Sequence, residues 1–372
     1  MKTLFILGRN PKLSIEEIKS YFEKTKNPIL SIQLNKNAII AETKKSPEKN
    51  IIEQFGGVIA IGKILAQGKF KEIISELEKQ EVYYGTENKL NYIIWNFSRN
   101  TFKLSEYLNK RFRKERLKAT EKRLTGQIQL QSGERIPNLQ SKLIDEQYFV
   151  FNDTKRDYFG KITEKVNYQE IEKRDMEKPV RRSSLSISPR LAKIMINLAQ
   201  INPKETLVDP FCGIGVILGE ALLQNINAIG IDQDKDAIDG ARKNLNWQKF
   251  NSQNYLLINN DSTKVRIKPA MAMATEPDFG NILKKRIPQH KAQQQIQQFE
   301  NLIINVLNNM KNYVNKKFVF TSPFIKVAKN QRIGCNINNI LEKTKLNLVK
   351  DFPIEEFRPG QPVGREIYVL EK

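Results

Sequence analysis

Short apolar runs and polar segments alternate along the first part of the chain in a mixture of strand-like and helix-like patterns. Three apolar runs of strand length are bounded by turn residues, at 3–7, 38–41 and 58–63. Between the first two runs, Ser14 and Glu17 have the spacing of a capping box at the start of an amphipathic helix. These patterns predict a small α+β domain over residues 1–65.

The next block, residues 66–168, combines further strand-like runs with the most basic segment of the chain. Strands are predicted at 92–97, 147–151 and 158–161. Residues 110–123 hold eight Lys or Arg against two Glu. This density predicts a helix face that contacts the phosphates of a nucleic acid, and a solvated helix surface explains it equally well. The candidate RNA contacts are Lys110, Arg111, Arg113, Lys114 and Arg116.

The pattern of apolar and polar residues changes near residue 184. Residues 169–183 are polar, include Pro179 and have the composition of an exposed linker. From residue 184 to residue 372, apolar strands and amphipathic helices alternate regularly. This alternation is typical of a mainly parallel sheet with helices on both faces, so the predicted fold class is α/β, with a Rossmann-like C-terminal domain.

Charge adds an expectation about partners. The 372 residues include 62 Lys plus Arg against 41 Asp plus Glu, which gives a net charge of +21. Such a field attracts polyanions, and nucleic acid is the expected partner, although a general lysine bias gives the same excess. Residues 1–180 contribute +10 and residues 181–372 contribute +11. No apolar run approaches the roughly 18 residues of a membrane span, so we expect a soluble, cytoplasmic protein that binds no membrane.

Cysteine and histidine are scarce, and this excludes several kinds of site. Cys212, Cys335 and His290 are the only ones in the chain. Three ligands cannot complete a four-ligand zinc site, so we expect no metal. The two cysteines provide no disulfide framework. We expect His290 in a solvent-exposed loop, and Cys212 as a packed residue rather than a nucleophile.

A glycine turn between a strand and a helix predicts a cofactor site. The apolar strand at 206–209 ends in Asp209, and Phe211, Gly213 and Gly215 follow before an apolar helix begins. The two glycines permit backbone torsions and a close cofactor approach that side chains would block.

Two further aspartates stand at the ends of the following strands. Asp232 ends the second strand, where a carboxylate suits the two hydroxyls of a ribose, and Asp261 follows the third strand. This order fits S-adenosylmethionine, with the methionine end over the glycine loop, the ribose at Asp232 and the adenine beside the third strand. Ordinary turn chemistry at strand ends is the alternative explanation for these aspartates.

The stretches 184–199 and 209–215 resemble the tRNA guanosine-10 N2-methyltransferase family, and the opening Gly8-Arg9 is similar to that of the family. The resemblance implies a class I Rossmann-like methyltransferase domain over residues 184–372. It also implies two N-terminal domains, a ferredoxin-like one over residues 1–65 and a THUMP-like RNA-binding one over residues 66–168. Its strength is greatest between residues 159 and 235.

Amino-methyltransferases carry an acid-Pro-Pro-aromatic motif after the fourth strand, and this chain has a variant of it. In register, Glu276 takes the acid position, Pro277 is the first proline, Asp278 replaces the second, and Phe279 is the aromatic that stacks on a flipped base. A carboxylate that accepts the protons of a delocalised amine makes that amine a usable nucleophile. Either Glu276 or Asp278 serves as this acceptor.

Together, the resemblance and the motif predict S-adenosylmethionine-dependent methylation of the exocyclic N2 amine of a guanosine in tRNA, at position 10. Methylation of adenine N6 or cytosine N4 in DNA is one alternative, and a catalytically inactive tRNA-binding protein is another. We expect a monomer. The sequence leaves open whether one or two methyl groups are added, and whether a small activating subunit is needed, as in some relatives.

Overall fold

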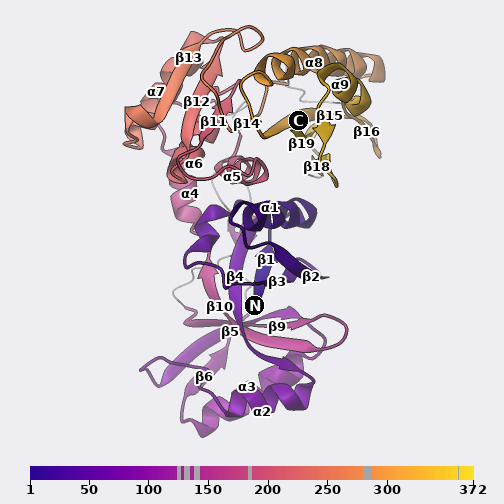
Figure 1. Ribbon diagram of the computed structural model, residues 1–372. Coiled ribbons are helices and arrows are strands. Elements are labelled where there is room, and N and C mark those ends of the chain that lie inside the picture. Colours follow the sequence, from indigo (N-terminus) through magenta and orange to yellow (C-terminus); the bar gives the residue numbers. More distant parts are fainter. Residues whose placement is uncertain (124–126, 130–134, 138–142, 183–186, 280–285, 359) are drawn as a thin grey trace. The chain divides into compact units, whose positions relative to one another are not determined.

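The structure is a computed structural model of the chain, drawn as a ribbon in Figure 1. It describes residues 1–372 apart from 124–126, 130–134, 138–142, 183–186, 280–285 and 359. The chain divides into two compact units. The first unit holds Met1–Pro11, Asn27–Glu53 and Gly57–Glu172, and the second holds Lys12–Lys26, Gln54–Gly56 and Lys173–Lys372.

An eight-stranded sheet forms the centre of the first unit, in the order β2-β3-β1-β4-β10-β9-β5-β6. Its strands are β1 (Lys2–Leu7), β2 (Ile29–Asn35), β3 (Ala38–Thr43), β4 (Val58–Gly68), β5 (Lys89–Phe97), β6 (Lys118–Glu121), β9 (Glu146–Asn152) and β10 (Asp157–Lys165). All six predicted strands are present, and β2 and β6 were not predicted. Strand β4 crosses the predicted boundary after residue 65, so strands of both predicted N-terminal domains share one sheet.

The helices of the first unit pack their apolar sides on this sheet. They are α2 (Phe70–Glu78) and α3 (Thr101–Lys114), and the short pair β7 (Gln127–Gln129) and β8 (Arg135–Pro137) forms a separate two-stranded sheet. Buried side chains from α2 and α3 join those of β5 and β9 in one core cluster, with Ile73, Leu77, Leu104, Leu108 and Phe112 facing Tyr92, Tyr148 and Val150. Their helical spacing explains why these segments fold as amphipathic helices.

The helix that we predicted from Ser14 is α1 (Pro11–Lys24), and it begins three residues before that position. Pro11 occupies the first turn, where its missing N–H leaves no helical hydrogen bond unmade. Ser14 and Glu17 are buried, and the Glu17 carboxylate accepts a hydrogen bond from the backbone N–H of Gly56 at 2.7 Å. The capping-box prediction is therefore wrong, because both side chains lie inside the helix.

The second unit is built on a nine-stranded sheet, in which β13-β12-β11-β14-β15-β19-β17 lie side by side. Its strands are β11 (Thr206–Asp209), β12 (Asn227–Asp232), β13 (Tyr255–Asn259), β14 (Ala272–Thr275), β15 (Lys317–Ala328), β16 (Gln331–Ile333), β17 (Asn347–Leu348), β18 (Ile354–Glu356) and β19 (Val363–Glu371). The five strands from β13 to β15 are parallel, and β19 is antiparallel to β15. The predicted parallel α/β sheet is thus confirmed.

The order of these strands reverses at β11. From β11 the chain continues to β12 on one side, and it later returns to β14 on the other side. In open parallel sheets, ligands bind at such a reversal, in the crevice outside the carboxyl ends of the strands. The ends of β11, β12 and β14 are therefore where a site is expected.

Helices precede the first strand of this sheet or follow one of its strands along the chain. They are α4 (Tyr168–Met176), α5 (Pro189–Leu198), α6 (Val216–Leu223), α7 (Lys235–Trp247), α8 (Gln289–Met310) and α9 (Ile337–Thr344), and two short 3-10 helices lie at Ile51–Gln54 and Ser252–Asn254. Among the helices that the structure describes, none combines the length and the apolarity needed to cross a lipid bilayer.

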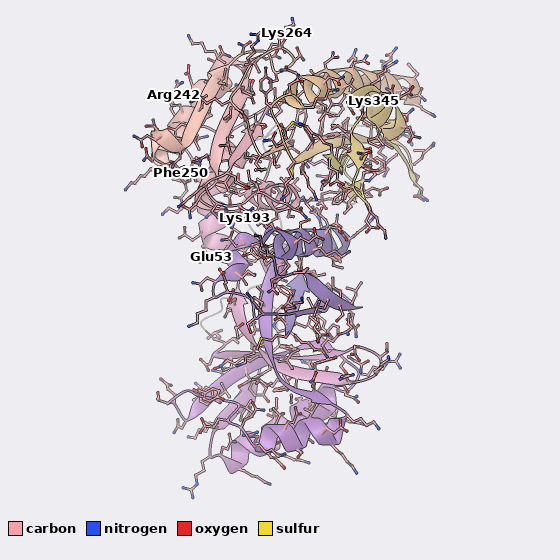
Figure 2. All side chains as sticks on the ribbon, in the orientation of Figure 1. Glu53, Lys193, Arg242, Phe250, Lys264 and Lys345 are labelled. Carbon is pink, nitrogen blue, oxygen red and sulfur yellow. The ribbon has the colours of Figure 1, made fainter. Side chains whose placement is uncertain are left out.

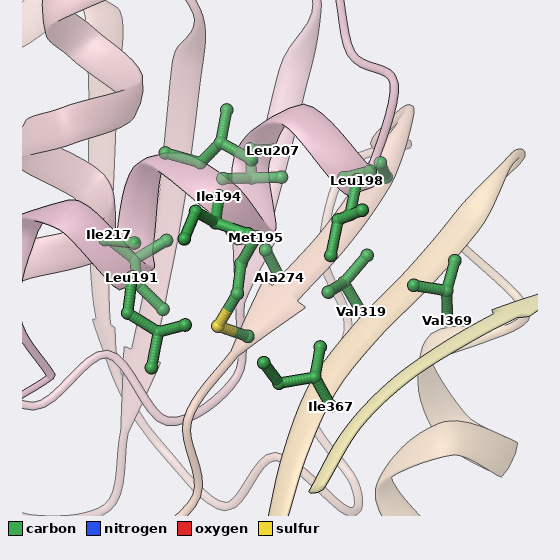
Figure 3. Close-up of a cluster of buried hydrophobic side chains, with 14 of the residues drawn as sticks. Leu191, Ile194, Met195, Leu198, Leu207, Ile217, Ala274, Val319, Ile367 and Val369 are labelled. Atoms are coloured by element: carbon green, nitrogen blue, oxygen red, sulfur yellow. The ribbon is translucent and has the colours of Figure 1, made fainter. Parts of the chain in front are cut away.

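Two hydrophobic clusters cover the two faces of this sheet, because successive side chains of a strand point to opposite sides. Leu207 and Val319 belong to the cluster under α5 and α6, whereas their neighbours Val208 and Phe318 belong to the cluster under α8. Figure 3 shows the first cluster, in which side chains of α5 lie against those of β14, β15 and β19. These two clusters hold the strand ends in fixed positions.

Helix α1 belongs to the second unit, although β1 and β2, its neighbours in sequence, belong to the first. Its Leu13 is part of the cluster under α5. The side-chain amide of Asn197, on α5, donates to the Glu17 carboxylate at 3.0 Å and to the carbonyl of Gln54 at 2.7 Å. Because Asn197 and Glu17 are fully buried, these bonds satisfy polar groups that water cannot reach.

A buried ion cluster stands beside the predicted linker. Residues 168–176 form α4, and Arg174 of this helix donates from Nε to the Glu220 carboxylate of α6 at 3.0 Å. Lys193 of α5, labelled in Figure 2, lies 3.9 Å from the other oxygen of Glu220. The Glu220 side chain is only 4% exposed, so its charge depends on these two cations.

We expect Glu220→Gln to lower the free energy of unfolding by about 3 kcal/mol, because removing one member of a buried ion cluster leaves the others without a counter-charge. A urea titration followed by circular dichroism measures the change. The matched control is Asp239→Asn, whose partner Arg242 (Figure 2) is 53% exposed in its side chain. Breaking that surface pair should cost about 0.5 kcal/mol or less, and equal losses in both variants would contradict the assigned role of Glu220.

Candidate active site

The glycine turn after β11 has the backbone geometry that the sequence predicts. Gly213 has φ +51° and Gly215 has φ +84°, a region that disfavours side chains. A Cβ at Gly213 would meet no atom within 4 Å, whereas one at Gly215 would stand 3.2 Å from the Cβ of Ala241. The turn therefore leaves open space beside Gly213, and Gly215 permits α6 to begin close to α7.

The Asp232 carboxylate holds this turn against the end of β12. Its Oδ2 accepts a hydrogen bond from the backbone N–H of Gly213 at 2.9 Å, and its Oδ1 accepts one from Asp234 at 2.9 Å. A carboxylate has about four acceptor sites, so the two oxygens can also accept bonds from two hydroxyls. This geometry fits the predicted ribose contact.

Asp209 links the cofactor turn to the motif after β14. Its Oδ1 accepts a hydrogen bond from the Thr275 hydroxyl at 2.6 Å and one from the backbone N–H of Phe211 at 3.1 Å. The side chain is buried, and burial raises the pKa of Asp209 to about 7, against the lowering effect of both hydrogen bonds. Sequence reasoning missed Thr275. Its place directly before Glu276 was the one feature of the sequence that could have indicated it.

A cavity of about 340 Å³ opens at the ends of β11, β12 and β14. Six of the ten predicted cofactor and catalytic residues line it, namely Asp209, Phe211, Gly213, Asp232, Glu276 and Asp278. Gly215, Pro277, Asp261 and Phe279 are not among its lining residues. The structure thus brings the predicted cofactor turn and both candidate acceptor carboxylates together in one cavity.

Asp261 lies in the loop that follows β13. Its Oδ1 accepts hydrogen bonds from the backbone N–H and the hydroxyl of Thr263, at 2.9 and 2.7 Å, and these bonds lower the pKa of Asp261. The side chain of Asn259 donates to the carbonyls of Asp232 and Gln233 at 2.9 Å each. The ends of β12 and β13 are therefore tied together, and the adenine contact of Asp261 stays a prediction.

Phe279 lies away from the lining of the cavity. Its ring packs edge-to-face on Phe299 of α8, with 5.9 Å between ring centroids and 72° between ring planes. It is partly buried beside the cluster under α8. The structure therefore gives Phe279 a packing role, and its stacking on a target base stays a prediction.

Sequence reasoning missed Arg365 and Arg182. Arg365, on β19, forms an ion pair with the Glu276 carboxylate through Nε. Arg182 lines the cavity and donates to the Asp234 carboxylate at 2.6 Å. Both arginines are distant in sequence from the carboxylates that they contact, so no local sequence pattern predicts these ion pairs.

Cys212 is a packed residue in this site. It is buried, and a Cβ added at Gly230 would stand 3.0 Å from its Sγ. Burial raises the pKa of the Cys212 thiol, which opposes formation of the nucleophilic thiolate. His290 is exposed as predicted, but it lies in the first turn of α8 and not in a loop. Within the described ranges, no group of His, Cys, Asp and Glu could hold a metal ion.

The basic segment of the first unit divides into bound and exposed cations. Arg111 donates to the carbonyl of Gln80 at 2.7 Å, to that of Leu77, and to the Glu115 carboxylate at 2.7 Å. Its guanidinium therefore joins the end of α2 to α3. The remaining candidate RNA contacts are exposed, namely Lys110, Arg113, Lys114 and Arg116. Because α3 ends at Lys114, these cations continue into the turn before β6 and do not form one helix face.

Family models match both parts of the chain. A model described as DNA methylase matches residues 5–243, more than half of the chain. The chain belongs to this methyltransferase family. A second model, described as an RMKL-like methyltransferase domain, matches residues 179–321. Methyltransferase is thus the established class, and the glycine turn and the motif after β14 both lie within the matched residues.

Curated relatives resemble part of the chain. The tRNA (guanine(10)-N2)-dimethyltransferase of Methanothermobacter thermautotrophicus is 35% identical over 96 residues, which are 26% of this chain and 28% of the relative. The enzyme of the same name from Pyrococcus abyssi is 30% identical over 129 residues, 34% of this chain and 36% of the relative. The matched part thus spans about a third of the length of these relatives.

A solved structure has a similar fold over its whole length. The crystal structure of TrmN from Thermus thermophilus is covered completely by this chain, with 14% identity and a TM-score of 0.50. At this identity the likeness concerns the fold alone, and it supports the α/β methyltransferase architecture.

The methyltransferase cavity fits S-adenosylmethionine, which is the cofactor of this domain. The open space beside Gly213 and the Asp232 carboxylate lie where the methionine and ribose parts of that molecule are expected. Asp209, Phe211, Gly213 and Asp232 would hold it, and it would supply an electrophilic methyl group.

We expect the stability of the methyltransferase to decrease as the pH rises through about 7, because the folded state holds the proton of Asp209 up to that pH and the unfolded chain releases it near 3.8. Between pH 5 and 8 the loss should be on the order of 3 kcal/mol, measured by urea unfolding. Asp209→Asn keeps an acceptor for Thr275 and should remove most of this pH dependence. An unchanged slope in that variant would assign the titration to another group.

We expect Asp232→Ala to weaken the binding of S-adenosylmethionine by about tenfold or more, because the carboxylate both orders the turn and accepts the ribose hydroxyls. Isothermal titration calorimetry measures the affinity. Phe279→Ala removes a side chain outside the cavity lining and should leave the affinity within about threefold. Parallel losses in the two variants would contradict these roles.

Proposed function

We propose that this chain transfers a methyl group from S-adenosylmethionine to the exocyclic N2 amine of a guanosine in tRNA, at position 10. The observation that carries the proposal is the single cavity in which Asp209, Gly213 and Asp232 meet Glu276 and Asp278. A cofactor turn alone would fit many methyltransferases, whereas acceptor carboxylates beside it are suited to an amine substrate.

The carboxylates would provide the chemistry that an aromatic amine needs. The lone pair of guanine N2 is delocalised into the ring, which makes the amine a poor nucleophile. A carboxylate oxygen of Glu276 or Asp278 would accept a hydrogen bond from the amine and orient it toward the methyl group. The same oxygen would take the proton that the nitrogen releases after it is methylated. A base inside a duplex cannot reach such a cavity, so the nucleotide must be flipped out.

The first unit would supply the grip on tRNA. Lys110, Arg113, Lys114 and Arg116 are exposed around the end of α3, and each phosphate that such a cation neutralises adds to affinity by releasing a counterion. We assign this role to a THUMP-like domain over residues 66–168, next to a ferredoxin-like domain over residues 1–65. Arg111 is left out of the contact set because its guanidinium binds carbonyls of its own unit.

The relatives support a tRNA substrate. Those from Methanothermobacter thermautotrophicus and Pyrococcus abyssi are named for guanine 10 of tRNA. The description of the family model as DNA methylase favours the second candidate, methylation of adenine N6 or cytosine N4 in DNA. The proposed contact of the first unit with RNA favours tRNA as the substrate. We further propose that the chain acts in the cytoplasm as a monomer.

The experiment is methyl transfer from labelled S-adenosylmethionine to tRNA transcripts that carry G or A at position 10, with duplex DNA as a third acceptor. We expect label on the G10 transcript alone, and nucleoside mass spectrometry then separates mono- from dimethylguanosine. Equal labelling of both transcripts would reject the position. Labelling of DNA but not tRNA would favour the second candidate. Binding of tRNA without binding of cofactor would indicate an inactive tRNA-binding protein.

A further inference from the structure

The motif of this chain departs from the pattern of amino-methyltransferases in two ways that loosen it. Glu276 stands where the pattern has Asp or Asn, and its side chain has one more methylene and one more rotatable bond. Asp278 stands where the pattern has a second proline, and proline fixes the backbone φ. Holding a Glu carboxylate in one orientation costs rotamer entropy. An acceptor at this position therefore needs a restraint that the motif itself does not supply.

Arg365 supplies that restraint from β19. Its Nε donates to Oε1 of Glu276 in an ion pair whose carboxylate side chain is only 9% exposed. Among the residues that the structure describes, Glu276 has no further hydrogen-bond partner, so its Oε2 is left to accept. A charge-assisted bond at a nearly buried carboxylate is stronger than one at the surface. One oxygen is thus held while the other stays available beside the cavity.

The direction of β19 explains how an arginine near the end of the chain reaches this place. Because β19 is antiparallel to β15, it begins at the edge of the sheet where β14 ends. The register pairs Thr275 with Phe320 and Arg365 with Pro323. Arg365 therefore stands beyond the carboxyl end of β14, and its long side chain reaches back to Glu276.

The backbone of Arg365 is anchored on both sides. β19 pairs with β15 through Pro323 and with β18 through Glu356 at this position. A guanidinium carried by a strand inside a sheet has a fixed origin, which a loop residue would lack. Because the backbone of Arg365 is fixed in the sheet, its ion pair with Glu276 restrains the Glu276 side chain.

The charges that line the cavity also favour an ion pair between Arg365 and Glu276. Its lining includes five carboxyl groups but, among the lining residues, Arg182 alone carries a positive charge. Arg365 adds a second positive charge at Glu276. Burial acts to lower the pKa of Arg365, but the Glu276 carboxylate outweighs it and the pKa is raised. The guanidinium therefore stays charged at any pH at which the chain would work.

We propose that Arg365 is a positioning residue for methyl transfer, which fixes Glu276 so that Glu276, and not Asp278, accepts the amine. This inference rests on the proposed function. Arg365 acts through Glu276 and does not itself touch the methyl group. Its removal should therefore slow the chemical step without weakening the binding of cofactor or tRNA.

The test is a double-mutant cycle on kcat with the tRNA transcript as acceptor. We expect Arg365→Gln to lower kcat at least about tenfold, with KM for tRNA and the Kd of S-adenosylmethionine within about threefold of the wild type. In a Glu276→Gln background the same change should alter kcat by less than about twofold, because the amide has no charge to pair with the guanidinium and cannot take the proton of the amine. Arg365→Lys, which keeps a cation, should restore part of kcat.

Asp278→Asn provides the matched control, since Asp278 is the other carboxylate of the motif and lines the same cavity. In that background Arg365→Gln should keep its full effect on kcat. An equal effect of Arg365→Gln in the wild type and in Glu276→Gln would overturn the proposal, as would an unchanged kcat in Arg365→Gln. If Arg365→Gln had no effect on kcat in the Asp278→Asn background, the arginine would position Asp278 and not Glu276, which would also overturn the proposal.

Two measurements keep these outcomes separate from other failures. Thermal unfolding of each variant shows whether it folds, and a stability loss without a change in kcat contradicts a positioning role. A wild-type chain that methylates no nucleic acid overturns the proposed function and this inference together. A wild-type chain that labels tRNA but shows no Arg365–Glu276 coupling overturns the inference alone.

Discussion

The hydrogen bond between the buried Asp209 carboxyl and the Thr275 hydroxyl is the constraint on which the second unit's site depends. It joins the ends of β11 and β14, the two neighbouring strands at which the strand order reverses. Asp209 orders the cofactor turn through Phe211, and Thr275 directly precedes the motif that holds Glu276. The strand ladder pairs Leu207 with Ala272 and Val208 with Met273, and this bond continues the connection through the last residue of each strand. It therefore fixes the proposed donor site relative to the proposed amine acceptor.

Local patterns in the sequence were sufficient for most of the architecture. The strand from 206, the glycines at 213 and 215, and the acid at 232 predicted the turn and its partner, because each requirement is met within a few residues. The same was true of six strands of the first unit, but not of β2 or β6. Where a local rule failed, a tertiary contact had replaced it. Ser14 and Glu17 have the spacing of a cap but are buried, since Glu17 binds Gly56 and Asn197 instead.

Contacts between distant residues could not be predicted in this way. Arg365 lies 89 residues after Glu276, and only the antiparallel course of β19 brings the two together. Arg111 has the composition of an RNA contact, but its guanidinium is occupied by carbonyls at the end of α2. Phe279 stands at the aromatic position of the motif and packs on Phe299. Arg111 and Phe279 have residue types suited to their predicted roles, but packing decides what their side chains contact.

Helix α1 affects how this protein could be divided or recombined. The chain passes between the two units five times, after residues 11, 26, 53, 56 and 172. A gene segment that starts at residue 173 would therefore encode a methyltransferase sheet without Leu13 in its core and without the partners of the buried Asn197 amide. The second unit is thus not encoded by one continuous gene segment, and a fusion at a single position would not transfer it intact. Exchange of either unit between proteins requires that its counterpart change with it.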